Sequence, residues 1–173
     1  IPVGVGNMSM KHIDKTLPRM VEAVKSILEE HKNEKGVIHT HTYKIAKYLK
    51  ENVKDSRLLL HTSENRDETL RKHRDSKKAT VLLSPSMTEG VDLKDELSRF
   101  QILMKVPYPY LGSPLIKKKM NKYDWYYGYA TAKTVVQAVG RSVRNENDIA
   151  VTYILDQGWD WFFQKNKEFF SSD

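Results

Sequence analysis

Short apolar segments alternate with segments of helical periodicity along most of this chain, and this alternation restricts the folds open to it more than any other feature. The apolar segments lie at residues 37–42, 57–61, 80–84, 101–106 and 149–155. Several are apolar at consecutive positions, as in Leu58-Leu59-Leu60, which requires a strand buried on both faces. Such strands are typical of a parallel sheet covered by helices on both sides. The sequence therefore predicts an α/β fold.

The helices are expected between these strands. Their predicted ranges are residues 14–35, 43–52, 64–76, 126–145 and 159–170. In the first of them, Val21, Val24 and Leu28 recur at helical spacing, Asp14 is placed to cap the start, and Pro18 is expected within the first turn. No Gly-, Pro- or Ser-rich stretch separates one part of the chain from another, so residues 1–173 are expected to form a single domain.

Composition excludes several classes of function. The chain has no cysteine, which excludes disulfides, thiolate metal sites and ligation of an Fe–S cluster by this chain. No apolar run approaches the roughly 20 residues of a membrane span, so no membrane partner is expected. The net charge of +7 favours a polyanionic partner. The chain begins at Ile1, without a signal peptide, and is expected to be a piece of a longer protein.

One constellation of polar residues lies near the end of the helix predicted over 126–145. Gln137, Gly140, Arg141 and Arg144 are spaced so that a helix places all four on one face, while Val136, Val139 and Val143 form a separate apolar stripe expected to face the sheet. Two guanidiniums that point in one direction fit a phosphate better than a carboxylate. The alternative is a solvated basic face with an incidental glycine.

A second constellation follows the strand predicted over 80–84. It combines hydroxyl groups with two carboxylates around a glycine, in the order Ser84, Ser86, Thr88, Glu89, Gly90, Asp92. Hydroxyls and free amides in such a turn can hold a phosphate oxygen, and a carboxylate can hold a ribose or orient an arginine. The alternative is an ordinary capped turn, in which Ser86 or Thr88 starts a helix with Glu89 in its first turn.

Together these segments resemble motifs IV, V and VI of superfamily 2 helicases, and more closely those of the XPD/DinG branch. The matching segments, in order, are His39-Thr40-His41-Thr42, Thr88-Glu89-Gly90-Val91-Asp92 and Gln137-x-x-Gly140-Arg141-x-x-Arg144. Val106-Pro107-Tyr108-Pro109 and Ile154-Leu155-Asp156 resemble two further segments of that branch. The resemblance spans residues 36–164. His41, where the family often has Ser or Thr, and the GRSVR pattern at 140–144 depart from it.

The resemblance implies a RecA-like parallel sheet sandwiched between helices, here the second lobe of the helicase, because the chain contains no G-x-x-x-x-G-K-[ST] phosphate loop. It implies an ATP-dependent DNA helicase moving 5′ to 3′, related to DNA repair enzymes, with ATP and Mg²⁺ held in the full-length enzyme. The partners it implies are single-stranded DNA and the N-terminal RecA-like domain of the same protein. This fragment alone is expected to be inactive. An intracellular, cytoplasmic location is expected, and the divergence of the sequence is compatible with a viral or bacterial source.

Carried over by position, the resemblance assigns three sets of residues. The catalytic set is Arg141, Arg144 and Gln137, with Arg144 favoured as the arginine finger. The ATP-binding set is Glu89, Gly90, Asp92 and Gly140. The nucleic-acid-binding set is Thr40, His41, Thr42, Ser84, Ser86 and Thr88.

A basic and aromatic stretch adds candidates for the nucleic-acid track. Lys117, Lys118 and Lys119 precede an aromatic run at 123–129, a combination used to bind single strands. The alternative is that the aromatic rings pack the start of the following helix while the lysines are solvated. The histidines show no metal-ligand spacing and are expected to be structural. The competing function is a non-catalytic nucleic-acid-binding module on a RecA-like fold.

Overall fold

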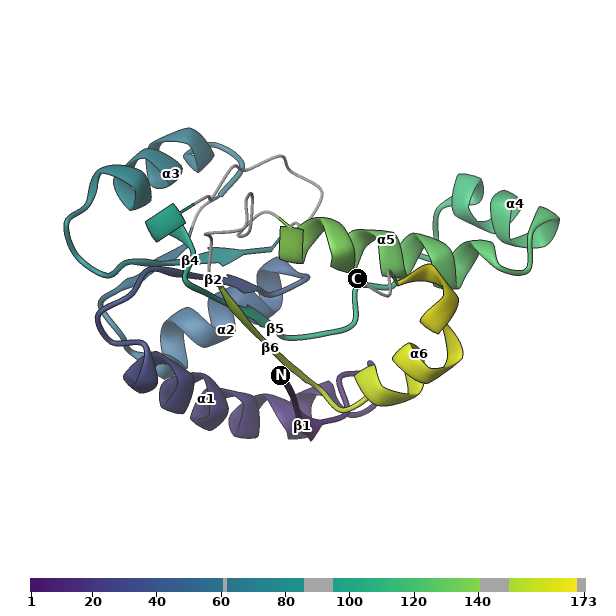
Figure 1. The fold of residues 1–173 in the computed structure, drawn as a ribbon, viewed down its shortest axis with the longest axis horizontal. Coiled ribbons are helices and arrows are strands. Elements are labelled where there is room, and N and C mark those ends of the chain that lie inside the picture. The colour runs from purple at the N-terminus through teal and green to yellow at the C-terminus, as the bar shows by residue number, and fades with distance from the viewer. Residues whose placement is uncertain (61, 86–94, 141–149, 171–173) are drawn as a thin grey trace.

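Six strands form one parallel sheet in the computed structural model, which describes residues 1–60, 62–85, 95–140 and 150–170 (Figure 1). The strands are β1 (Pro2–Gly6), β2 (Gly36–His39), β3 (Leu58–Leu60), β4 (Val81–Ser84), β5 (Phe100–Leu103) and β6 (Val151–Asp156). Their order across the sheet is β1-β6-β5-β2-β4-β3, and every pair is parallel. The predicted α/β class with a parallel sheet is confirmed.

Helices cover the sheet on both faces. They are α1 (Ile13–Glu30), α2 (Tyr43–Val53), α3 (Arg66–Asp75), α4 (Pro114–Lys122), α5 (Tyr126–Gly140) and α6 (Trp159–Lys165), with short 3-10 turns η1 (Asp95–Leu97) and η2 (Lys167–Phe169). The chain crosses the sheet in one direction through α1 and α2 and in the other through α3 and α5. Right-handed crossovers therefore place these pairs on opposite faces, as Figure 1 shows.

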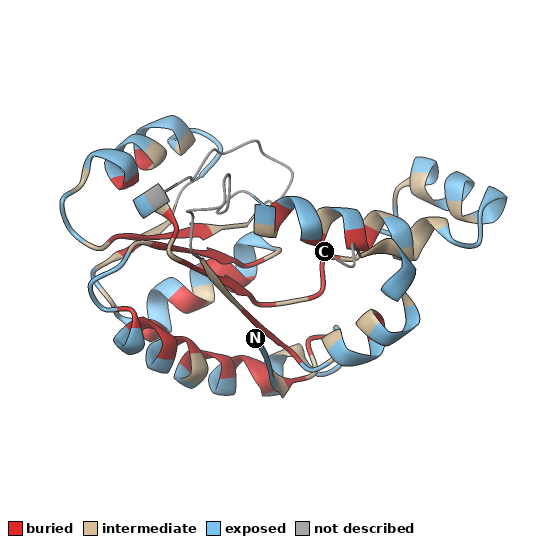
Figure 2. Ribbon diagram, in the orientation of Figure 1, coloured by how far each residue is buried: buried red, intermediate tan, exposed pale blue. Residues whose placement is uncertain are grey.

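The core explains why the strands are apolar at consecutive positions. In β2, Ile38 packs in the large cluster with α1 and α2, whereas the neighbouring Val37 packs in a separate cluster with Leu70 of α3. In β5, Leu103 packs instead against Val135 of α5. Figure 2 shows burial concentrated in the strands and the inner helix faces. Alternate residues thus pack into different layers, so an unpaired polar side chain on either face of a strand would destabilise the fold.

Two elements were missed by the sequence reasoning. The edge strand β1 pairs only with β6, and most of its residues are exposed, so it lacks the apolar run that identified the other strands. Helix α4 has no buried residue and hence no apolar stripe. Its remaining signals were local ones, Ser113 at the N-cap and Pro114 in the first turn.

Several predicted boundaries were wrong. Helix α1 ends at Glu30 rather than residue 35, because the Arg57 guanidinium donates to the carbonyl oxygens of Leu28 (2.8 Å) and His31 (3.2 Å) and so satisfies the helix end from outside. Pro18 lies inside α1, beyond its first turn. Helix α5 is described to Gly140, and the rest of its predicted range lies outside the described residues. Among the described helices, none is long and apolar enough to cross a membrane.

Candidate functional site

The carboxyl ends of the strands meet at one edge of the sheet, since all pairs are parallel. His39 at the end of β2 is in register with Ser84 of β4 on one side and Leu103 of β5 on the other. The next backbone amide, that of Thr40, donates to the Ser84 carbonyl oxygen at 2.9 Å. The segment after β2 and the constellation that starts at Ser84 therefore begin side by side. In parallel sheets this edge is where ligands bind.

The loop after β2 is held from within by hydroxyl groups. Thr40 is fully buried, and its Oγ1 donates to the Thr42 carbonyl oxygen (3.1 Å) and lies 3.3 Å from the Ser84 carbonyl oxygen. The exposed Thr42 caps α2, because its Oγ1 accepts from the Ile45 amide at 3.2 Å. Thr40 thus fixes the loop, and Thr42 stands at the surface.

His41 lies between these threonines in an unusual backbone conformation. Its φ of 71° is in the left-handed region, which costs a residue other than glycine about 1 kcal/mol or more. Burial, and next the positive charge of Lys105, lower the pKa of the His41 imidazole. The ring is therefore neutral at physiological pH, with one nitrogen to donate and one to accept a hydrogen bond. This strained residue ends the extended segment predicted over 37–42.

Helix α5 carries the described part of the constellation that begins at Gln137. Its buried residues are Thr131, Ala132, Val135 and Ala138, and Val139 packs partly against the same cluster. Gln137 is exposed on the opposite side, and a Cβ added at Gly140 would find no described atom within 4 Å. The prediction that Val136 faces the sheet was wrong, because it is 49% exposed and the buried stripe runs one residue earlier.

Seven of the predicted site residues lie outside the described residues. They are Arg141, Arg144, Ser86, Thr88, Glu89, Gly90 and Asp92. The last described residues before them are Pro85, which follows β4, and Gly140 of α5.

Asp156, at the end of β6, holds two further loops at the same edge. It is buried, and its carboxylate accepts from the Val106 amide and the Gly158 amide, both at 2.9 Å. Tyr108 follows in the first of these loops and stacks on Tyr127 of α5. Burial, with Asp156 and Tyr127 adding to it, raises the pKa of Tyr108 to about 12. The acidic residue of the Ile154-Leu155-Asp156 segment thus orders the loops around it.

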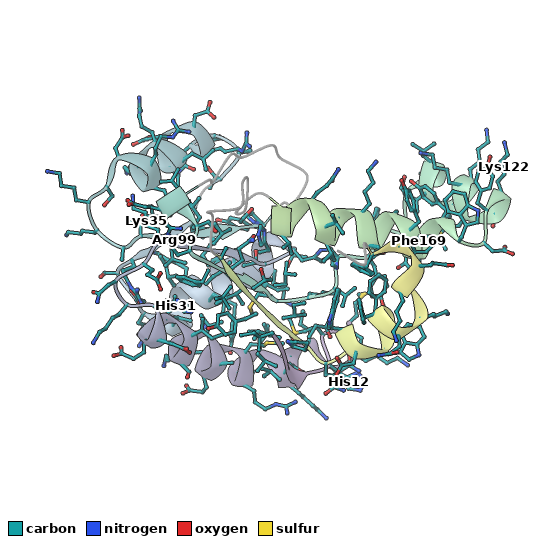
Figure 3. The ribbon with its side chains drawn as sticks, in the orientation of Figure 1. His12, His31, Lys35, Arg99, Lys122 and Phe169 are labelled. Atoms are coloured by element: carbon teal, nitrogen blue, oxygen red, sulfur yellow. The ribbon has the colours of Figure 1, made fainter. Side chains whose placement is uncertain are left out.

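The basic and aromatic stretch forms a surface on α4 and the start of α5. Lys117, Lys118 and Lys119 are exposed on α4, which packs against α5 and stands out from the sheet (Figure 1). Lys119 Nζ lies 5.2 Å from the centre of the Tyr126 ring. Figure 3 places Lys122 at the α4 end of the molecule, opposite to Lys35 and Arg99, which precede β2 and β5.

Aromatic rings continue this surface and line a pocket of about 550 Å³. Trp125 (51% exposed) contacts Tyr123 and Tyr129 through its ring, and Tyr129 contacts Phe169. The pocket lies between the start of α5 and α6, and it includes Trp161 and Lys165. These rings pack on one another, as expected if they have a structural role. They also remain partly open to solvent, as expected if they bind a single strand. The pocket was missed because its lining comes from segments that are far apart in the sequence, around residues 124–128 and 161–169.

Comparison with known proteins assigns the family. The family model described as "Helicase C-terminal domain" matches residues 24–166. The chain belongs to the helicase C-terminal domain family. It spans only about an eighth to a sixth of the length of the curated relatives described next.

Two of these relatives are DNA helicases. The "ATP-dependent DNA helicase CHL1" of Scheffersomyces stipitis is 29% identical over 104 residues, which is 48% of this chain and 12% of that protein. The "ATP-dependent DNA helicase DinG" of Photobacterium profundum is 30% identical over 112 residues, 58% of this chain and 16% of that protein. This helicase C-terminal domain is thus similar to one part of each.

Solved structures show the same fold. An XPD apo structure matches with a TM-score of 0.77 at 18% identity, covering 96% of this chain and 38% of that one. The C-terminal domain of the DEAD-box protein Dbp5 matches with a TM-score of 0.61 at 13% identity, covering 88% of this chain and 79% of that one. The helicase C-terminal domain described here is therefore RecA-like, as the sequence predicted.

The buried histidines of this domain are bonded within the protein. His73 Nε2 donates to the Leu97 carbonyl oxygen (2.7 Å), and its Nδ1 pairs with Thr80 Oγ1 (2.8 Å). Burial lowers the pKa of His73 to about 4, so its ring is neutral. His31 bridges Tyr153 and Glu34 and stacks on Phe100. In the described ranges, no group of three or more His, Asp or Glu side chains could hold a metal ion.

Proposed function

We propose that this chain is the second RecA-like domain of an ATP-dependent DNA helicase that moves 5′ to 3′ along single-stranded DNA. One observation supports this beyond family membership. The loop after β2 and the end of β4 are joined by the bond from the Thr40 amide to the Ser84 carbonyl oxygen, at the ligand-binding edge of the sheet. The segments that resemble motifs IV and V therefore start from one place.

In this proposal, ATP lies between the domain and its N-terminal RecA-like partner. Arg144 acts as the finger on the γ-phosphate, Arg141 neutralises the phosphates or grips Asp92 or Glu89, and Gln137 positions water or nucleotide. Fixed positive charge stabilises the charge that develops during phosphoryl transfer. We assign the phosphate loop and the Mg²⁺ to the partner domain, as the family resemblance implies, because the sequence of this chain contains no G-x-x-x-x-G-K-[ST] motif.

The single strand is proposed to contact the loops at the same edge. Thr42 and the neutral His41 present hydrogen-bonding groups there, Thr40 holds their loop in place, and Ser84 begins the turn that carries Ser86 and Thr88. These groups suit phosphate oxygens, which are contacted by hydroxyls and backbone amides in many complexes. Lys117, Lys118 and Lys119 would add sequence-independent attraction for the strand.

The proposal is tested by Arg144→Ala in the full-length protein, with ATP turnover and DNA affinity measured in parallel. Loss of an arginine finger is expected to reduce turnover by about 10³-fold or more while DNA binding persists. Arg74→Ala is the matched control, because Arg74 is an exposed arginine on α3. Turnover that survives in the Arg144 variant, with only DNA affinity reduced, would show that the catalytic assignment of Arg144 is wrong.

Direction is tested separately. Duplexes that carry a single-stranded tail on either the 5′ or the 3′ side are offered to the full-length protein with ATP. Unwinding of the 5′-tailed duplex alone is expected. Preference for the 3′-tailed duplex would contradict the proposed direction and leave the assignment of a helicase domain intact.

A further inference from the structure

Two buried polar side chains connect the end of β2 to residue 139 of α5. His39 Nε2 lies 2.7 Å from Gln101 Oε1, and Gln101 Nε2 lies 3.2 Å from the Val139 carbonyl oxygen. His39 is 3% exposed and Gln101 is 1% exposed. The link passes from β2 through β5, its immediate neighbour in the sheet, to the helix above.

The direction of each bond follows from the chemistry of the groups. The Val139 carbonyl oxygen only accepts, so the Gln101 amide nitrogen donates to it and the amide oxygen faces His39. That oxygen also only accepts, so His39 carries its proton on Nε2. The Val139 carbonyl oxygen thus receives a donor from the sheet.

Packing alone would not select glutamine at this position. All four residues of β5 are buried, and its other members are Phe100, Ile102 and Leu103. A buried amide adds to stability little or nothing unless both of its ends are paired, whereas an apolar residue there would bury without that requirement. A fully paired polar group inside an apolar strand instead fixes one relative position of the elements that it joins.

We propose that Gln101 is a positioning residue that sets α5, at residue 139, against the end of β2. The inference rests on the proposed function, because residue 141 follows Gly140 directly and is the first of the two arginines assigned to ATP. At its other end, the link reaches His39, whose next residue, Thr40, opens the loop assigned to the DNA strand. Gln101 therefore connects the loop assigned to the strand with the helix that precedes the arginines assigned to ATP.

Two substitutions separate the ends of the link. Gln101→Glu keeps an oxygen that accepts from His39 but removes the donor to Val139 and sets a carboxylate against that carbonyl. Gln101→Met removes both bonds at similar side-chain volume. Thr80→Val is the matched control, because it removes a buried hydroxyl that pairs with His73, on the far side of β2 from β5.

The first readout is the DNA-stimulated ATP turnover of the full-length protein, expressed per folded molecule. Both Gln101 variants are expected to lower kcat by about tenfold, with KM for ATP changed less than threefold and Thr80→Val close to wild type. A merely structural role would lower the folded fraction without changing kcat per folded molecule. Unchanged kcat in the Gln101 variants, or an equal loss in the control, would overturn the proposal.

The second readout does not depend on activity. Hydrogen exchange of peptides covering residues 132–140 is measured in the full-length protein without nucleotide. Both Gln101 variants are expected to exchange about tenfold faster there, and Thr80→Val is not. Unchanged exchange would refute the link itself. Faster exchange in a protein whose wild-type form has no DNA-stimulated turnover would instead refute the proposed function and leave the positioning role standing.

Discussion

Asp156→Asn is expected to destabilise the domain substantially, because the carboxylate is the shared acceptor of two loops. It is 7% exposed and accepts from the Val106 and Gly158 amides at 2.9 Å each. A hydrogen bond to a charged group contributes about 1.5–3 kcal/mol. The asparagine side chain keeps one acceptor and turns an N–H towards the other amide.

From these contacts we expect the substitution to cost about 3 kcal/mol, through one lost charged bond and one amide left without an acceptor. For a chain of 173 residues this corresponds to a melting temperature lower by roughly 6–12 °C. Urea unfolding followed by tryptophan fluorescence measures the free energy, and calorimetry measures the melting temperature. Trp159, next to Gly158 on α6, reports on the region directly.

The matched control is Asp160→Asn, which removes the same charge from an exposed position on α6. It is expected to change the free energy of unfolding by less than about 0.5 kcal/mol. Equal effects of the two substitutions would show that net charge, and not the two amide bonds, determines the result. A loss below about 1 kcal/mol for the Asp156 variant would refute the reasoning outright.

Two further predictions concern other packed positions. The pKa of His73 is lowered to about 4 in the fold, so on acidification the unfolded chain binds a proton before the folded chain does. The free energy of unfolding should therefore fall by about 3 kcal/mol between pH 6.5 and 4. His73→Gln should remove this pH dependence, as measured by urea unfolding at successive pH values. Gly128→Ala would place a Cβ 2.0 Å from Asn166 Oδ1. We expect the free energy of unfolding to fall by about 1–3 kcal/mol, and Asn166→Ala to relieve this loss in a double-mutant cycle. Additive losses in the cycle would contradict this contact.

The central sheet could be predicted because burial on both faces leaves a direct trace in the sequence. The segment at 80–84 carries it, and β4 lies within that segment with Val81, Leu82 and Leu83 buried. The mostly exposed edge strand β1, and α4, which has no buried residue, leave no such trace, and both were missed. Helix ends depended on distant partners, as when Arg57 binds the carbonyls at the end of α1.

The candidate site divides in the same way. The sequence placed Thr40 and Ser84 at the ends of two strands, and the structure joins them at one edge of the sheet. Motif spacing did not reveal that Val136 lies outward, since a shift of one residue along a helix turns a side chain by about 100°. Nor did it point to Gln101, because a single polar residue in a short apolar run resembles an exception until its partners are known.

The residues that carry the family resemblance therefore have two kinds of physical role. Thr40 and Asp156 belong to the matching segments, yet both are buried and bond to backbone groups of adjoining loops. Loops beyond the ends of a sheet have backbone groups with no strand partner, and one buried acceptor or donor can hold each of them. Thr42, by contrast, is exposed on the loop that Thr40 holds, and His41 is partly exposed beside it. A motif in this fold thus includes residues that place a loop as well as residues that the loop presents. Substituting Thr40 or Asp156 should lower stability and activity together, and so should substituting Thr42, because it also caps α2, whereas substituting His41 should lower activity alone.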